Sequence, residues 1–488
     1  MRWHRASNLG KEAAIDTLTG ATGAPVRTKG LGLPAWSWAM YQGARDPYVI
    51  LITIYVFMPY FVTTVVGDPV KGQALAAAAA KYAGWGVMAL APMLGATVDR
   101  MGRRKPWLAG VMALIIPLIF SLWWTYPDGS GLSVTMVVTI TAIIGVLFAF
   151  TETLHNALLL PAAGMARAGS ASGLALAFGN FVSVTMLIFV LFAFALPGVV
   201  DWSFIPKVPL FGLDIAAHQQ DRIVAPIVAV VMAVGVLPLF LFVPDVAPTG
   251  IRFGAALRAG AGDLLALFKE ARGHRDAMIF LVARLIYVDG MTGILVFTGV
   301  YAAGAMGWGT LELLMYGLLL SMFAVCGGLL AGRLDQRFGP KRALTFELIG
   351  IIATQLVTLG MTRDTFFYMA WPAEKHPPVW DGPMFTTAPE LGLLFTGFVG
   401  AIVVTAAYAS SRTMLTRVVP RERIGVFFGL FVIAGSATMW LGPMLVQYAT
   451  QWSGSQRIGL LPISGLLLTG LIIQSFVRGG GPVTHHDD

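Results

Sequence analysis

Twelve long apolar stretches constrain the fold of this sequence more than any other feature. A helix needs about 20 mostly apolar residues to cross a bilayer, and a helix satisfies its own backbone polar groups in lipid. We place six spans at roughly 36–66, 73–98, 107–126, 133–160, 173–199 and 222–243. Six more follow at roughly 277–304, 309–332, 343–361, 389–411, 424–450 and 456–477. The sequence therefore predicts an all-α membrane protein with twelve transmembrane helices.

Composition and missing motifs exclude several classes of protein. Only 12% of the residues are charged, whereas a soluble domain carries about 25%, so a soluble enzyme is excluded. The single Cys326 excludes a disulfide framework and a cysteine metal site, and no His-x-x-x-His pair occurs. His-Glu-x-x-His, Gly-x-Ser-x-Gly and the Gly-x-x-x-x-Gly-Lys-Ser/Thr phosphate loop are also absent. We expect no catalytic activity, no bound metal, no cofactor and no ATP-driven step.

Most of the basic residues lie in the predicted tails and in the loops on one side of the membrane. With the N-terminus placed inside, 25 of the 33 Lys and Arg residues fall in the tails and on inside loops, as the positive-inside rule requires. This pattern places both termini in the cytoplasm and offers no basic face for nucleic acid. It divides the chain into a tail (1–35), a first half (36–243), a linker (244–276), a second half (277–477) and a final tail (478–488). Within the linker, residues 263–272 are expected to form an amphipathic interfacial helix.

The two predicted halves repeat each other. Ala44-Arg45 in the first span matches Ala283-Arg284 in the seventh, at an offset of 239 residues. The loop Asp99-Arg100-Met101-Gly102-Arg103-Arg104 matches Gln336-Arg337-Phe338-Gly339-Pro340-Lys341 at an offset of 237. Pro161 after the fourth span is echoed with looser spacing by Pro420 after the tenth. The order is kept, which indicates two related six-helix halves.

Parallel six-helix halves with a substrate site between them are the architecture of the major facilitator superfamily. The sequence Gly95-x-x-x-Asp99-Arg100-x-Gly102-Arg103-Arg104 resembles that superfamily's signature between the second and third spans, and Arg337 and Gly339 belong to the second copy. The resemblance implies alternating access, with these two loops acting as a conformational switch. A purely topological role for the loops is the alternative.

Other short motifs indicate one branch of this superfamily. They are Trp36-Ser-Trp38-Ala-Met-Tyr41, Asn156-Ala-Leu158-Leu-Leu-Pro161 and Gly299-Val-Tyr301-Ala-Ala-Gly304. They resemble the fungal vacuolar amino-acid effluxers of autophagy and their bacterial relatives. The resemblance implies a monomeric transporter, which we expect in a bacterial inner membrane. The sequence differs from the family pattern after Tyr41, where Gln42 and Arg45 stand in place of an Asp and an Asn.

Polar side chains inside the spans supply the candidate substrate site. Arg45 and Arg284 hold equivalent places in the repeat, and a guanidinium can bind a carboxylate with two hydrogen bonds. For Arg45 the alternative is a pair with Asp46 close to the membrane surface. Four further candidates are hydrogen-bonding groups within spans, with helix–helix bonding as their alternative role: Tyr48, Asn180, Tyr287 and Tyr408.

Acidic residues inside the spans supply the candidates for proton coupling. Glu152 and His155 are three residues apart, so they share a helix face and are placed to exchange a proton. The alternative is that Glu152 forms an ion pair with Arg45 or Arg284. Asp46 and Asp289 are the other two candidates.

These observations together predict a secondary active transporter for a small organic solute. The expected solute is an amino acid or another zwitterionic or anionic metabolite, and protons are the expected coupling ion. One alternative is a sodium- or proton-coupled symporter for glycosides or hexuronides. A more distant one is a non-transporting membrane sensor that kept a transporter fold.

Overall fold

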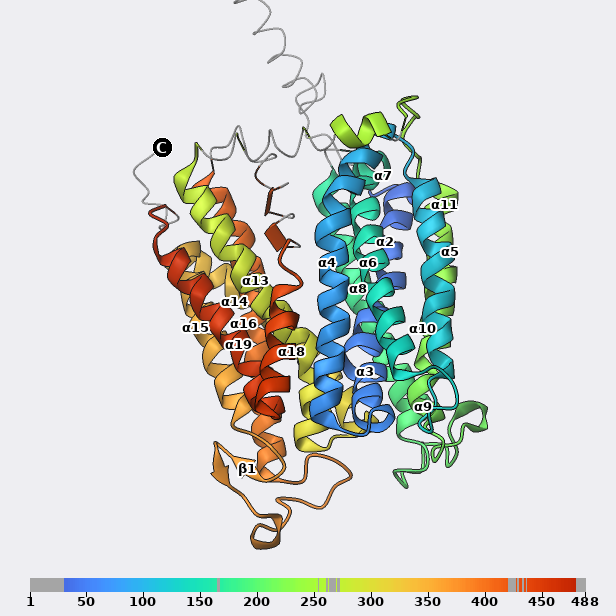
Figure 1. Ribbon diagram of the computed structural model, residues 1–488, viewed down its shortest axis with the longest axis vertical. Helices are drawn as coiled ribbons and strands as arrows, with labels where there is room; N and C mark the ends of the chain where they lie inside the picture. The colour runs from blue at the N-terminus through green and yellow to red at the C-terminus, as the bar shows by residue number, and fades with distance from the viewer. Residues whose placement is uncertain are drawn as a thin grey trace, which may run out of the picture.

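The chain folds into two helical bundles that stand side by side, as the computed structural model shows (Figure 1). The structure describes residues 30–479 except 165–166, 253, 260–261, 263–268, 270–272, 420–426, 428–429, 432–433 and 436. The predicted amphipathic helix at 263–272, except residue 269, and most of both tails therefore lie outside the described residues.

The first bundle holds the spans of the N-terminal half. Its first span joins four pieces: α2 (Leu33–Pro47), η1 (Tyr48–Tyr55), α3 (Phe57–Tyr60) and η2 (Phe61–Val65). The next helices are α4 (Pro69–Met101), α5 (Lys105–Ser121) with η3 (Leu122–Trp124), and α6 (Val134–Ala157) with α7 (Leu159–Ala163). The bundle ends with α8 (Ala168–Val190), η5 (Leu191–Ala195), η6 (Leu210–Gly212), α9 (Gln219–Arg222), α10 (Val224–Gly235) and α11 (Leu237–Phe242).

The second bundle holds the C-terminal half. It contains α13 (Arg275–Tyr301), η7 (Ala302–Met306), α14 (Thr310–Phe338) and α15 (Pro340–Leu359). A short antiparallel ribbon follows, in which β1 (Thr365–Phe366) pairs with β2 (Met369–Ala370), and then η8 (Ala373–Lys375). The last helices are α16 (Ala388–Val418), α18 (Leu441–Ser453) and α19 (Gln456–Ser475).

Ten helical segments among the described residues are long and apolar enough to cross a membrane. Helices α4 and α18 are not among the ten, but they lie at the second and eleventh predicted spans. The observed first segment, Leu33–Val65, agrees closely with the predicted span. The predicted helical membrane fold is confirmed, and the ten segments together with α4 and α18 are consistent with the twelve predicted spans.

Capping residues explain where several helices begin. Asp68 accepts hydrogen bonds from the backbone N–H groups of Val70 and Lys71 at 2.9 and 3.1 Å, directly before Pro69 opens α4. Thr387 and Glu390 form a reciprocal capping box at the start of α16. In the first span, the wide turns of η1 begin directly after Pro47, which has no N–H to donate to the helix.

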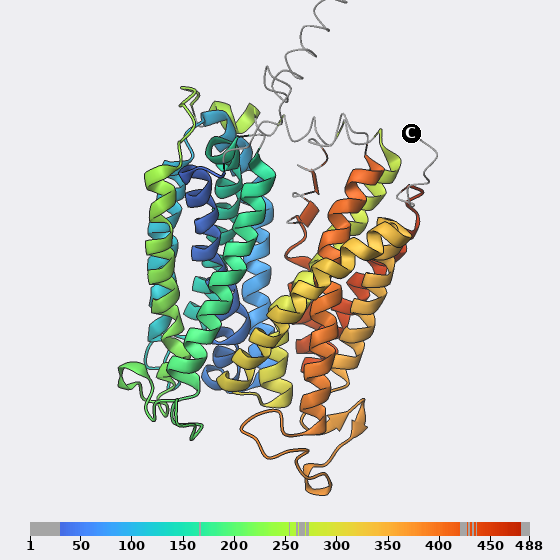
Figure 2. The same ribbon diagram turned by 180° about the vertical axis from the view of Figure 1, so that it is seen from behind.

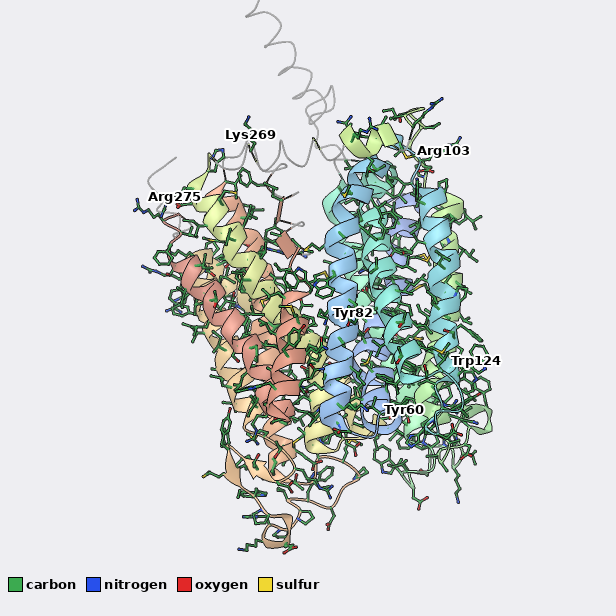
Figure 3. The ribbon with its side chains drawn as sticks, viewed as in Figure 1. Tyr60, Tyr82, Arg103, Trp124, Lys269 and Arg275 are labelled. Atoms are coloured by element: carbon green, nitrogen blue, oxygen red, sulfur yellow. The ribbon has the colours of Figure 1, made fainter. Side chains whose placement is uncertain are left out.

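The bundles contact each other at one end and diverge toward the other in both views (Figures 1 and 2). We call the end that carries α9 and the β1–β2 ribbon the loop end. The opposite end carries the start of α13, and we call it the termini end. Figure 3 shows Tyr60 near the loop end, and Arg103 and Arg275 at the termini end. Close approaches between the halves involve α4 with α18, α13 with η1, and α14 with α8.

Candidate functional site

A cavity of about 320 Å³ lies between the two halves. The N-terminal half contributes Asn180 and residues of η1, including Ile54 and Tyr55, and the C-terminal half contributes residues of α13, α14, α15, α16 and α19. Its polar lining consists of hydroxyl and amide groups: Tyr55, Asn180, Thr298, Tyr301, Tyr316, Ser321, Thr354, Gln355, Thr358, Thr396 and Thr405. None of these described lining residues is charged. A mostly apolar cavity with a few polar groups is typical of a small-molecule site.

Of the predicted substrate residues, only Asn180 lines this cavity. Tyr48 packs against Phe148, with ring centroids 5.1 Å apart. Tyr287 shares a hydrogen bond with Ser411 at 2.8 Å, inside the second bundle. The tyrosines and threonines of the cavity were missed because hydroxyl groups are common in all the spans. A usable sequence signal was the four-residue spacing of Thr354 and Thr358, which places both on one polar face of α15.

Tyr408, another predicted substrate residue, lies close to Thr292 and outside the cavity lining. Their hydroxyl groups lie 3.4 Å apart, between α16 and α13. Tyr408 is three residues from Thr405, which lines the cavity, so the two residues lie on neighbouring positions of one helix face.

Arg45 and Glu152 form an ion pair in the first bundle. Arg45 Nη2 lies 2.9 Å from Glu152 Oε2, and the side chains are 7% and 54% exposed. The Arg45 guanidinium also lies 4.2 Å from the centroid of the Phe148 ring. Asp46 instead accepts a hydrogen bond from Gln42 at 2.8 Å. The structure thus shows the ion pair that was one of the two interpretations of Glu152, with Arg45 as its partner.

His155 is held away from Glu152. Its Nε2–H donates to the carbonyl oxygen of Trp38 at 2.8 Å, and Trp38 Nε1 donates to the His155 carbonyl oxygen at 2.7 Å. The two rings stack with centroids 4.2 Å apart, and His155 is buried. The residues therefore clamp α2 to α6. The structure does not bring Glu152 and His155 into contact, and proton exchange between them stays a prediction.

Arg284 is buried without a carboxylate partner among the described residues. Its guanidinium lies 3.4 Å from the centroid of the Phe431 ring, and the residue is 8% exposed. Its Nε and Nη1 atoms have no hydrogen-bond partner in the described part of the chain. Burying an ionised group without such partners is costly, and a bound anion would supply the missing hydrogen-bond acceptor.

Two buried carboxylates lie in the second bundle. Asp289 accepts a hydrogen bond from the backbone N–H of Gly442 at 2.7 Å, at the start of α18. Glu347 accepts one from Ser410 at 2.9 Å, and its second oxygen has no partner among the described residues. Asp289 was predicted as a proton-coupling residue, and Glu347 was not selected from the sequence.

The first predicted switch loop ties neighbouring helices of its own half together. Gly102 has φ +90°, and an added Cβ would lie 2.1 Å from the Ala247 carbonyl oxygen, so a glycine is required there. The backbone N–H groups of Arg104 and Lys105 donate to Asp245 at 2.9 and 3.2 Å. Arg104 Nη1 also donates to the carbonyl oxygen of Ala157, at 2.6 Å.

The other residues of the first loop, and those of its second copy, have the following surroundings. The carbonyl of Arg100 accepts from Thr249 at 2.5 Å, and an added Cβ at Gly95 would lie 3.1 Å from Thr153. Arg103 is exposed, and the side chain of Asp99 lies outside the described residues. In the second copy Gly339 has φ +78°, and Arg337 lies over the Phe338 ring at 5.4 Å. A role in switching stays a prediction.

Two six-helix bundles around a shared cavity define the major facilitator architecture, and solved structures of that class are similar in fold. The nucleoside transporter NupG, solved as a point mutant, has a TM-score of 0.60 at 12% identity, over 92% of this chain and 100% of that one. A D-xylose-proton symporter has a TM-score of 0.58 at 14% identity, over 92% and 97%.

Sequence comparisons narrow the class to a family. Residues 86–479 match the model of the "Vacuole effluxer Atg22 like" family, and the chain belongs to this family of integral, multi-pass membrane proteins. The uncharacterized MFS-type transporter YxiO of Bacillus subtilis is 24% identical over 43% of this chain and 42% of its own length. Autophagy-related protein 22 of Saccharomyces cerevisiae is 29% identical over 44% and 38%. The chain thus spans about two fifths of the length of these relatives.

Proposed function

We propose that the chain is a secondary active transporter that moves a small organic solute by alternating access. The observation that carries this proposal is the cavity lined by residues of both halves. A solute bound there contacts both bundles, so rocking one bundle against the other would move its access from one end to the other. Because one chain contains both halves, we propose that it works as a monomer, with both termini in the cytoplasm of a bacterial inner membrane.

The solute we favour is an amino acid or another zwitterionic or anionic metabolite. Support comes from Arg284, whose buried guanidinium has unused hydrogen-bond donors. Arg284 lies ten residues from Ile294, which lines the cavity, and ten helical residues span about 15 Å. An anionic group would therefore meet Arg284 on the way between the cavity and the termini end. Proton coupling is supported by the buried Asp289, because carboxylates inside spans commonly serve as proton relays.

A sugar is the second candidate for the solute. The described cavity lining has hydroxyl and amide groups but no charge, and such groups suit the hydroxyls of a neutral polyol. The coupling ion in that case would be sodium or a proton.

Exchange transport in proteoliposomes separates these candidates. Liposomes loaded with unlabelled solute are tested for uptake of a mixture of radiolabelled amino acids, and in parallel for uptake of the neutral sugar D-xylose. We expect amino-acid exchange, with a raised KM in Arg284→Ala and partial recovery in Arg284→Lys. Thr354→Val, which alters the cavity, should also raise the KM. Exchange of sugars alone would favour the second candidate, and an unchanged KM in Arg284→Ala would remove Arg284 from the solute pathway.

Proton coupling needs a separate measurement. Uptake of the exchanged solute is driven by an imposed pH gradient in the same liposomes. We expect Asp289→Asn to retain exchange and to lose gradient-driven accumulation. If Asp289→Asn lost exchange and gradient-driven accumulation to the same extent, Asp289 would have a structural role. Its substitution would then impair solute movement itself and not only its coupling to protons.

A further inference from the structure

Hydrogen bonds between the halves close the loop end at two places. Gln73 of α4 donates to Thr450 Oγ1 of α18 at 2.9 Å and to the Gln456 carbonyl at 3.1 Å. Gln456 Nε2 returns a bond to the Pro69 carbonyl at 3.0 Å. At the second place, the Thr310 hydroxyl of α14 donates to the Asp221 carboxylate of α9. Among these described hydrogen bonds between the halves, only the one from Thr310 to Asp221 involves a charged group.

Asp221 is a buried carboxylate, with 3% of its surface exposed. Besides Thr310, it accepts hydrogen bonds from His218 Nδ1 at 2.9 Å and from Gln220 Nε2 at 3.3 Å. Both of these donors belong to its own half. Thr310 is therefore the described partner that Asp221 loses if the halves separate at the loop end, whereas His218 would move together with it.

Among the described residues, His218 is the side chain that bonds directly to Asp221 and becomes positively charged when protonated. Arg222 makes other bonds: it donates to the carbonyl oxygens of His218, Trp123 and Ala217 and lies over the Trp123 and Tyr126 rings. Its charge opposes protonation of His218 but is outweighed by the hydrogen bond to Asp221.

Other titratable groups lie nearby but make different bonds. Tyr60 places its ring 5.6 Å from that of His218 and donates its hydroxyl to the Thr125 carbonyl oxygen. Glu312 of α14 accepts from the Gly309 N–H at 3.0 Å, and Asp128 accepts from Ser130. His218 is therefore the titratable group whose charge acts most directly on Asp221.

Protons can reach His218 from the loop end. Its side chain is 37% exposed, and a pocket of about 310 Å³ beside it is lined by residues of both halves, among them His218, Asp221, Thr310 and Glu312. The imidazole can thus gain or lose a proton while the halves remain in contact.

We propose that His218, Asp221 and Thr310 form a pH-responsive latch, in which protonated His218 keeps the loop end closed and loss of that proton favours its opening. The inference rests on the proposed alternating access, because a latch has a function only if the halves move. A protonated imidazole supplies the positive charge that makes a buried carboxylate tolerable. When the imidazole is neutral, Asp221 is buried with neutral donors only, and opening relieves this cost by hydrating the carboxylate.

The direction of the pH effect follows from the ion pair. The hydrogen bond from His218 to Asp221 raises the pKa of His218 above its ordinary value. A raised pKa in the closed form means that the contribution to closure is fully present below the ordinary pKa of histidine. It is lost as the pH rises through the raised pKa. Each pH unit between the two pKa values changes the ratio of open to closed forms by at most about tenfold.

Distances between spin labels test the latch without any solute. The full-length protein carrying Cys326→Ser is labelled in lipid nanodiscs, at Ser130→Cys and Glu374→Cys for the loop end. A second preparation is labelled at Leu160→Cys, an exposed position of α7 outside the predicted switch loop, and at Arg275→Cys for the termini end. We expect the long loop-end distance to gain population as the pH rises, while the termini-end distance shortens in step.

Three substitutions separate the parts of the latch. His218→Gln should abolish the pH response and show the high-pH populations at every pH. Asp221→Asn should also abolish the response but keep the loop end closed, because a neutral amide needs no counter-charge. Thr310→Val should raise the ratio of open to closed forms about tenfold or more at every pH, since a hydrogen bond to a carboxylate is lost, and should leave the pH range over which this ratio changes in place.

The possible outcomes separate a failure of the proposed latch from a failure of the proposed alternating access. A pH response that survives in His218→Gln, or a Thr310→Val protein with wild-type populations, would overturn the latch. If neither label pair shows a second distance at any pH or in any variant, the halves do not move and the proposed alternating access fails as well.

Discussion

Gly299 permits a close approach between the backbones of the two halves. A Cβ added to Gly299 of α13 would lie 1.7 Å from the carbonyl oxygen of Ile54 in η1, whereas ordinary contact begins at 3.4 Å. Gly299→Ala therefore forces a separation of about 1.7 Å, the difference between these two distances. Overpacking of this kind costs about 1–3 kcal/mol and acts on the closed form, whereas the better helix propensity of alanine stabilises the closed and open forms equally. We expect the closed loop end to lose about 1–3 kcal/mol, roughly a 5- to 150-fold change in the ratio of open to closed forms.

The loop-end label pair measures this change directly. Gly299→Ala should raise the population of the long distance at constant pH. Gly465→Ala on α19 is the matched control, because an added Cβ there meets nothing within 4 Å. The control should leave the distances unchanged and raise the melting temperature slightly. If Gly299→Ala and Gly465→Ala gave the same distance distributions, the tight crossing of α13 over η1 would not hold the halves in this arrangement.

Four further substitutions test contacts within the bundles through the free energy of unfolding in mild detergent. Glu152→Gln should cost about 1–3 kcal/mol, because Arg45 is only 7% exposed and loses its charged partner. Arg45→Met should cost less, since the remaining Glu152 is 54% exposed and stays hydrated; the opposite order would contradict the unequal burial. His155→Ala should cost about 3–5 kcal/mol because it removes a stacked ring and a hydrogen bond to Trp38, and a loss below about 1 kcal/mol would contradict the clamp. Thr387→Ala should cost about 1 kcal/mol through loss of the α16 cap, with Thr387→Ser as the variant expected to retain it.

The fold was predictable because its main determinants are local sequence patterns that can be recognised without knowing any tertiary contact. Apolar length locates the spans, the distribution of Lys and Arg fixes their alternation, and the repeated loop motif pairs the halves. The breaks within spans were less predictable. The first span contains two stretches of wide helical turns, η1 and η2, and only Pro47 gives a local signal for the first of them.

The site was less predictable because helical spacing identifies a face but not the partner of that face. Glu152 and His155 share the expected spacing, yet Glu152 pairs with Arg45, 107 residues away in the sequence. Hydroxyl groups are harder still to interpret. Thr298 and Thr354 line the cavity, but each also donates to the carbonyl oxygen four residues before it, as many threonines in membrane helices do. The sequence alone cannot separate these two uses.

The repeat does give a reason for the different surroundings of the two arginines. The offset of 259 that relates Pro161 to Pro420 carries Glu152 to Ser411. Ser411 shares its hydrogen bond with Tyr287, so the second bundle has a hydroxyl where the first has the carboxylate that neutralises Arg45. Each guanidinium lies over an aromatic ring, Phe148 in one bundle and Phe431 in the other, but the offset carries Phe148 to Ala407, so the two rings are not equivalent in the repeat. The cation is thus preserved while the counter-charge is lost from one half, and this asymmetry is what makes Arg284, rather than Arg45, the candidate to meet an anionic solute.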